Sequence, residues 1–213
     1  MPKYVPQSVE LIDHMGTDLT VVNSARVSYD KKSEVLDEKD QKLLGYLAKH
    51  GHWTPYAHAF LSFRIKAPIF VARQLVKHQV GLAWNEVSRR YVDSEPEFYV
   101  PKEWRGRPVN SKQGSDGVID LGSGWIFPAE TVSNSLNAYN ELLARGVAPE
   151  QARMLLPLST MTEWIWSGSV AAFSRVCRLR LDPHAQQETR EIAEIISSQA
   201  QEKFPYSWKA LLN

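Results

Sequence analysis

The chain has 213 residues, of which 43% are hydrophobic and 23% charged, and its formal net charge is +1. Such a composition excludes a chain too polar to fold and fits one large domain or two small ones. The near-neutral charge argues against a nucleic-acid partner held by a broad basic surface, and one cysteine excludes a disulfide framework. Without an apolar signal segment or a run of about 18 apolar residues, we expect a cytoplasmic protein with no membrane partner.

Hydrophobic spacing in the first half predicts short strands that alternate with helices. Residues 59–65 alternate like a half-buried strand, and Pro68 is a good first residue for the helix that follows, because proline lacks an N–H that would go unpaired there. In chain order we expect a strand at 9–15, helices at 20–28 and 40–50, a strand at 59–65, a helix at 69–79 and short strands at 90–92 and 98–100.

The second half predicts mostly helices. Residues 102–126 are rich in Gly, Ser, Arg and Lys and are too long for an ordinary connection, so they are usually functional or mobile. Helices are expected at 129–145, 149–156, 170–178 and 184–203, and a strand at 161–166, with Ile192, Ile195 and Ile196 facing inward. The chain therefore predicts a mixed α+β fold with a small, mainly antiparallel sheet packed with helices. No G-x-G-x-x-G follows a strand, so this is not a Rossmann fold.

The stretch 68–91 carries the densest chemistry in the chain. As a helix, its first part would place Arg73, Gln74, Lys77 and His78 on the face opposite its apolar stripe. The segment from Trp84 to Tyr91 then combines an amide, a carboxylate, a hydroxyl and two guanidinium groups. A solvated helix face with a polar loop is the ordinary interpretation. The mixture of donors, acceptors and an indole also fits a site for a polar, planar, anionic ligand.

Other residues leave alternatives open. His50, His52 and His58 could seed a metal-dependent nucleotide phosphohydrolase, but no acidic residue lies between them and we expect no metal. The cluster of Arg and Trp could instead belong to a noncatalytic nucleotide- or RNA-binding module, which steep salt dependence of RNA affinity would reveal. Cys177, the only thiol, lies within an expected helix and is more typical of a core residue than of a nucleophile.

Several segments, taken in order, resemble the flavin-dependent thymidylate synthases. That family's signature is Arg-His-Arg, seven residues and Ser; here Lys77-His78-Gln79 is followed by eight residues and Ser88, with Asn85-Glu86 and Arg90 in place. The segment His52-Trp53-Thr54-Pro55-Tyr56-Ala57-His58 resembles the family's His-x-Thr-Pro-x-x-His. Further matches are Ala25-Arg26-Val27-Ser28, Glu150-Gln151-Ala152-Arg153, Leu179-Arg180 and His184-Ala185-Gln186.

The resemblance implies a single domain over 1–213 that methylates dUMP to dTMP reductively. Methylenetetrahydrofolate would be the carbon donor, and FAD reduced by NADPH the hydride source. Arg180 would be catalytic, because a cation beside the uracil ring stabilises negative charge at N3 and O2. Binding of dUMP is implied for Gln74, Lys77, Glu86, Val87, Ser88, Arg89, Arg90, Arg153 and Arg180. Binding of FAD is implied for Ser28, His52, Thr54, Lys77, His78, Gln79, Glu86, Ser169, Ala171 and Arg175.

The resemblance also implies a homotetramer with shared active sites, in which residues 52–58 and 74–90 of one site come from different protomers. The chain departs from the family pattern at Lys77 and Gln79, where the family has arginines, and at Ser169 and Ala171. A lysine keeps the charge of arginine but not its planar fork, and alanine keeps neither. We therefore expect FAD to be held more loosely than is usual in the family.

Overall fold

A computed structural model describes residues 1–92, 94–109, 114–122 and 127–213. Its centre is a four-stranded antiparallel sheet with the order β2 (Ser8–Met15), β3 (Phe60–Pro68), β8 (Met161–Ser169) and β4 (Leu82–Glu86). The α+β class and the mainly antiparallel sheet are therefore confirmed. Among the described residues, no helix combines the length and the apolar character that crossing a membrane requires.

Strict alternation gives this sheet one apolar and one polar face. Phe63 pairs with Trp166 in the β3–β8 register, and both side chains are fully buried. On the opposite face Ser62 and Ser167 share a hydrogen bond of 2.6 Å, and Arg64 forms an ion pair with Glu163. Side chains two residues apart on a strand share a face, so this pattern fixes which side the helices cover.

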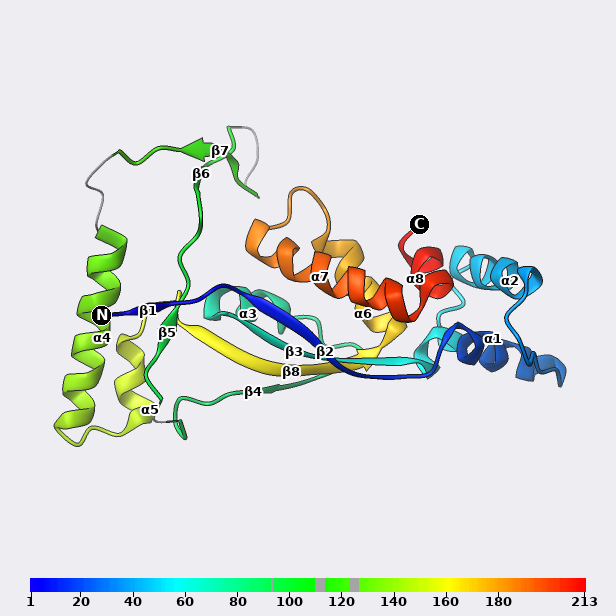
Figure 1. The fold of residues 1–213 in the computed structure, drawn as a ribbon, viewed down its shortest axis with the longest axis horizontal. Helices are drawn as coiled ribbons and strands as arrows, with labels where there is room; N and C mark the ends of the chain where they lie inside the picture. Colours follow the sequence, from blue (N-terminus) through cyan, green and yellow to red (C-terminus); the bar gives the residue numbers. More distant parts are fainter. Residues whose placement is uncertain (93, 110–113, 123–126) are drawn as a thin grey trace.

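Three helices cover the apolar face: α6 (Val170–Arg180), α7 (Gln187–Lys203) and α8 (Pro205–Leu212) (Figure 1). Phe173 of α6 packs edge-on against Phe63 and Trp166, with ring centroids 5.0 and 5.2 Å away. Trp208 of α8 is fully buried and donates to Ser197 at 2.9 Å. Burial of these large rings holds α6 rigidly on the sheet. This matters because α6 carries residues of both clefts described below.

Further helices lie beyond the two ends of the sheet (Figure 1). Helices α1 (Asp18–Arg26) and α2 (Glu38–Lys49) lie at one end, and α4 (Phe127–Ala144) and α5 (Pro149–Ala152) at the other. Residues of α4 and α5 form a smaller core of their own with Phe98, separate from the main one. The remaining elements are α3 (Ile69–Leu75), the 3₁₀ helices Val27–Tyr29, Thr54–His58 and Arg153–Leu155, and the short strands β1 (Lys3–Tyr4), β5 (Glu97–Phe98), β6 (Trp104–Gly106) and β7 (Asp116–Ile119).

Most predicted elements are present with ends shifted by a few residues, but some predictions were wrong. Residues 90–92 form no strand; Tyr91 N–H donates to the Ser88 carbonyl at 2.9 Å in a turn. The helix expected at 69–79 ends at Leu75, so Lys77 and His78 lie in the turn that follows it. Ile195 is 38% exposed rather than inward. Strand β4, the β6–β7 hairpin and α8 were not predicted.

Candidate active site

A polar cleft lies where α6 ends and the chain turns into α7. Its volume is about 830 Å³. It is lined by Gln74, Arg105, Gly114, Ser115, Arg178, Leu179, Arg180, Asp182, His184, Ala185 and Gln186. These residues include three guanidinium groups and one carboxylate, so the cleft favours an anionic ligand. The Asp182 carboxylate already accepts from the His184 backbone at 2.7 Å, and this hydrogen bond lowers the pKa of Asp182.

Arg180 is oriented within the polar cleft by His78. Its Nε donates to His78 Nε2 at 3.0 Å, which requires that nitrogen to be unprotonated. Burial, and next the charge of Arg180, lower the pKa of His78, so the imidazole is neutral at pH 7. Within the described residues, the terminal guanidinium nitrogens of Arg180 have no hydrogen-bond partner. Arg180 therefore presents a fixed cation to whatever occupies the cleft.

Gln74 is held in the same cleft by two hydrogen bonds. Its Nε2 donates to Gln186 at 2.8 Å, and its Oε1 accepts from the Thr189 hydroxyl at 2.9 Å. Thr189 is fully buried on α7. The fold thus brings together Gln74, His78 and Arg180, three of the residues that the sequence singled out.

A second cleft, of about 940 Å³, lies at the opposite end of α6; we call it the Gly81 cleft. It is lined by Trp53, Ala57, Phe60, Val80, Gly81, Leu82, Ala83, Ser167, Gly168, Ser169 and Arg175. Arg180 is the last of the eleven residues of α6 and Ser169 caps its first turn, so the two lie about 16 Å apart at the α-helical rise. The segment 74–83 is joined to α6 by two hydrogen bonds, one from Arg180 to His78 and one from Arg175 to Val80.

Backbone packing shapes the Gly81 cleft. Gly81 has φ +75°, a left-handed conformation that favours glycine, and a Cβ on Gly168 would lie 2.5 Å from the Gly81 carbonyl oxygen. Arg175 Nη2 donates to the Val80 carbonyl at 2.8 Å. The first amides of α6 are partly used, because Val170 N–H donates to the Ala59 carbonyl and Ala172 N–H to Ser169 Oγ. Arg175 is therefore the main group in this cleft that can attract an anion.

A third group of predicted residues lies outside both clefts, at and beyond the end of β4. Glu86 accepts from Thr162 Oγ1 at 2.7 Å and from Trp84 Nε1 at 3.1 Å. Arg90 donates through its backbone and its Nε to Ser88 Oγ, at 3.3 and 3.2 Å. Val87 and Arg89 belong to the same segment, and Arg153, in the 3₁₀ helix after α5, also lies outside both clefts. One chain therefore does not bring the 86–90 segment to the cleft that holds Gln74 and Arg180.

The remaining predicted residues are scattered. Ser28, His52, Thr54, Lys77 and Gln79 are exposed. Thr54 belongs to the 3₁₀ helix whose residue Ala57 lines the Gly81 cleft, so it lies beside that cleft. Ala171 is 2% exposed within the main core and lines neither cleft.

The structure bears on the roles that the sequence left open for Cys177 and for the histidines. Cys177 is fully buried, burial raises the pKa of its thiol, and its Sγ lies 3.6 Å from the Ala193 carbonyl, which confirms the core assignment. In the part of the chain that the structure describes, no three His, Cys, Asp or Glu side chains gather as a metal site would need.

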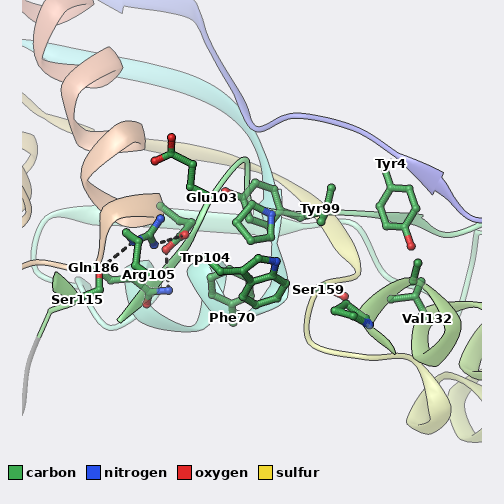
Figure 2. Close-up of a pocket in the computed structure, with 15 residues that line it drawn as sticks. Tyr4, Phe70, Tyr99, Glu103, Trp104, Arg105, Ser115, Val132, Ser159 and Gln186 are labelled. Atoms are coloured by element: carbon green, nitrogen blue, oxygen red, sulfur yellow. Dashed lines mark hydrogen bonds and ion pairs between the residues drawn. The ribbon is translucent and has the colours of Figure 1, made fainter. Parts of the chain in front are cut away.

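Sequence reasoning missed several lining residues of the polar cleft, above all Arg105 and Ser115. Both come from the β6–β7 hairpin within the stretch predicted only as a long loop. They also line a neighbouring cavity of about 520 Å³ whose wall includes the rings of Phe70, Tyr99 and Trp104 (Figure 2). Gln186 lines both spaces as well, so Arg105, Ser115 and Gln186 separate an aromatic cavity from the polar cleft.

These features define a class of protein: an α+β protein whose central sheet is antiparallel and whose polar cleft offers an oriented arginine to an anionic ligand. Comparison with known proteins agrees. Residues 10–206 match the family model described as "Thymidylate synthase complementing protein", and the chain belongs to this family.

Named relatives extend the comparison. The chain is 40% identical over 207 residues to the flavin-dependent thymidylate synthase of Thermosipho africanus, covering 96% of this chain and 90% of the relative. It is 38% identical to that of Thermus thermophilus, covering 95% and 74%. Among solved structures, the UMP/dUMP methylase PolB of Streptomyces cacaoi, bound with 5-Br dUMP, superposes with a TM-score of 0.88 at 28% identity, covering 99% of this chain and 96% of that one.

Proposed function

We propose that this protein is a flavin-dependent thymidylate synthase that methylates dUMP to dTMP reductively. The observation that carries the proposal is Arg180 in an anion-favouring cleft, a cation oriented by His78 whose terminal nitrogens have no partner among the residues that the structure describes. The relatives named thymidylate synthase and the dUMP methylase of similar fold support it. Family membership also disfavours the metal-dependent phosphohydrolase and the noncatalytic RNA-binding module.

In this proposal dUMP occupies the polar cleft. Arg180 lies beside the uracil ring and stabilises negative charge at N3 and O2, which raises electron density at C5, the atom that accepts the new carbon. Gln74 and the two other arginines of the cleft bind polar parts of the nucleotide. Since Cys177 is buried, the reaction does not use a cysteine thiolate. Methylenetetrahydrofolate is the proposed carbon donor.

The residues of the Gly81 cleft fit a flavin, which we propose to be FAD. The cleft is of suitable size, and Arg175 and the close-packed glycine backbone suit a diphosphate that approaches the main chain. When bound, the flavin supplies the hydride that completes the methyl group, after reduction by NADPH. Trp53 and Ala57 form another wall of this cleft, with His52 and Thr54 next to them.

We further propose that FAD is held loosely, so that the protein purifies partly empty. Lys77 and Gln79 are exposed and Ala171 is buried, so none offers the bidentate contact that an arginine gives. Added FAD should then raise the melting temperature by mass action on the native state. Flavin that stays at one per chain through long dialysis, without a thermal shift on further addition, would contradict this.

The separation of Ser88, Arg90 and Arg153 from the polar cleft leads us to propose shared sites in a homotetramer. In this proposal each active site combines the polar cleft of one protomer with the 86–90 segment of another. Within one chain residues 53 and 57 already lie against residues 80–83, so the expected split between 52–58 and 74–90 is not required at the Gly81 cleft. A fully active monomer in sedimentation would contradict shared sites.

Mixed assemblies sharpen this test. At dUMP concentrations far below saturation, Arg180→Ala and Arg90→Ala should each lose most of their activity when expressed alone. In co-expressed tetramers that assemble at random, roughly a quarter of composite sites would carry both native arginines, so activity should partly return. If each site lies within one chain, the mixture stays as inactive as its parts.

The function itself is tested by the absorbance spectrum of the pure protein followed by an assay for dTMP. Flavin absorbance, together with dTMP formed from dUMP, methylenetetrahydrofolate and NADPH, is the expected result. UMP is the informative second substrate, because the similar structure is titled a UMP/dUMP methylase. Colourless protein with stoichiometric metal, or RNA binding without NADPH oxidation, would contradict the proposal.

A further inference from the structure

A chain of side-chain hydrogen bonds links the interior of α7 to the β6–β7 hairpin through the wall of the polar cleft. It begins at the Thr189 hydroxyl, passes through the amides of Gln74 and Gln186, and reaches Glu188, to which Gln186 Nε2 donates at 3.1 Å. Arg105 Nη2 donates to the other oxygen of Glu188, and Arg105 Nε donates to Ser115 Oγ at 2.8 Å. Figure 2 shows Arg105, Ser115 and Gln186 together at this wall.

Glu188 is the one residue in this series of hydrogen bonds that is both buried and charged. Its side chain is 5% exposed, and that of Arg105 21%. Burial acts to raise the pKa of Glu188, but the hydrogen bonds from Arg105, its own backbone and Gln186 outweigh burial, and the pKa lies below its ordinary value. The carboxylate is therefore ionised at neutral pH, and an ionised carboxylate only accepts hydrogen bonds.

This property sets the direction of every amide in the chain. Because Glu188 only accepts, Gln186 must turn its NH₂ toward Glu188 and its oxygen toward Gln74. Gln74 must then turn its NH₂ toward Gln186 and its oxygen toward the Thr189 hydroxyl, as the hydrogen bonds show. Counting partners in the described residues only, one N–H and one lone pair of the Gln74 amide remain for a ligand, with their positions decided by Glu188.

We infer that Glu188 is a positioning residue for the nucleotide: through Gln186 it fixes the orientation of the Gln74 amide, and through Arg105 it holds the β6–β7 hairpin at the polar cleft. It acts without touching the ligand. The inference rests on the proposed function, because it takes dUMP as the ligand of the polar cleft.

Glu188→Gln tests the inference with little change in shape. A glutamine at 188 offers one acceptor to two donors, Gln186 Nε2 and Arg105, so the amides must reverse or leave a group unpaired. We expect dUMP affinity, measured by calorimetry without folate or NADPH, to fall about tenfold, and KM for dUMP to rise while kcat changes little. Glu191→Gln is the matched control: it lies on the same helix, contacts Gln7, and does not line the polar cleft.

A swapped pair separates orientation from stability. In Gln186→Glu with Glu188→Gln, the carboxylate at 186 accepts from Gln74 and from the new amide at 188, whose oxygen accepts from Arg105. Net charge and the direction of Gln74 are both kept, while the carboxylate moves to a residue that lines the cleft, so the swap should bind dUMP more weakly than the native protein but more tightly than Glu188→Gln alone. A folded swap that binds dUMP no better than Glu188→Gln, or Glu188→Gln that binds dUMP normally, would overturn the inference. If the native protein binds no dUMP, the proposed function fails instead.

Discussion

The two groups of residues assigned to the nucleotide differ in how the chain holds them. In the polar cleft, Arg180 bonds to a residue 102 positions away, and Gln74 to residues 112 and 115 positions away. In the 86–90 segment and Arg153, the arginines bond to residues two, five and three positions away. Tertiary structure fixes the first group, whereas the arginines of the second group have mainly local contacts.

This difference has an energetic meaning. Side chains held by the fold have already lost their rotamer freedom, so a ligand gains the full benefit of each contact. Side chains held locally must be ordered by the ligand or by another copy of the chain, and part of the binding energy is used for that ordering. We therefore expect mutation of Arg180 to act mainly on turnover and mutation of the locally held arginines to act mainly on affinity.

The largest effect is expected for Arg180→Ala. Removing one preorganised electrostatic stabiliser typically lowers turnover about a hundredfold or more, so dTMP formation should nearly vanish while bound flavin, measured by absorbance, remains. Arg180→Lys should be nearly as poor, since a compact ammonium lacks the planar fork. Turnover within a few-fold of the native rate would mean that Arg180 is not the stabilising cation.

A smaller effect is expected for Arg90→Ala in the locally held half. A charge-assisted hydrogen bond contributes about 1.5–3 kcal/mol, so dUMP affinity should fall at least about tenfold. The melting temperature without ligand should not change, because Arg90 contacts only Ser88 and the ring of Tyr91 among the described residues. Arg145→Ala, which removes an exposed pair with Glu141, is the control. A large loss of melting temperature would show that Arg90 belongs to the fold.

The contrast between local and long-range contacts also explains which elements could be predicted from the sequence. Strands β3 and β8 and helices α6 and α7 follow local hydrophobic periods, so their existence was predictable. Strand β4 is a short edge strand that ends in Asn85 and Glu86, and a polar ending hides a strand from such patterns. The pairing of β6 with β7 joins Trp104 to Ile119 across a long stretch, which no local period reveals.

For the site, the order of matching motifs along the chain indicated the family. The resemblance to the family then indicated Arg180 and Gln74. It did not lead to Arg105 or Glu188, because their ion pair joins positions 83 residues apart and Arg105 lies in the stretch where the resemblance is weakest. Nor did it show that Gln74 and Ser88 fail to meet within one chain. Long-range contacts are set by packing of the whole fold, which motif spacing does not encode.

A third prediction concerns the effect of pH on stability and turnover through His78, which orients Arg180 in the polar cleft. Since burial and Arg180 lower the pKa of His78, the folded protein binds fewer protons than the unfolded chain, and stability rises with pH through this interval. As the pH falls below about 6.5, the unfolded chain takes up a proton first and stability falls; once the pH passes the lowered pKa, His78 protonates in the folded protein, loses the Arg180 hydrogen bond, and turnover should fall as well.

His78→Gln provides the comparison for this prediction, because its amide oxygen can accept from Arg180 without titrating. The variant should show a smaller fall in melting temperature over the same range. Parallel curves for the variant and the native protein would show that other groups cause the pH dependence.

The smallest effect on activity is expected for Cys177→Ser, which changes the core beneath α6 and neither half of the site. The serine hydroxyl can donate to the Ala193 carbonyl as the thiol does, although the shorter side chain fits less well, so stability should fall by about 1 kcal/mol. The rate of dTMP formation should be unchanged, because a fully buried thiol of raised pKa is not a nucleophile. A folded, flavin-bound variant without activity would instead require a thiol mechanism, and Arg180 would then lose its place as the group on which the reaction depends.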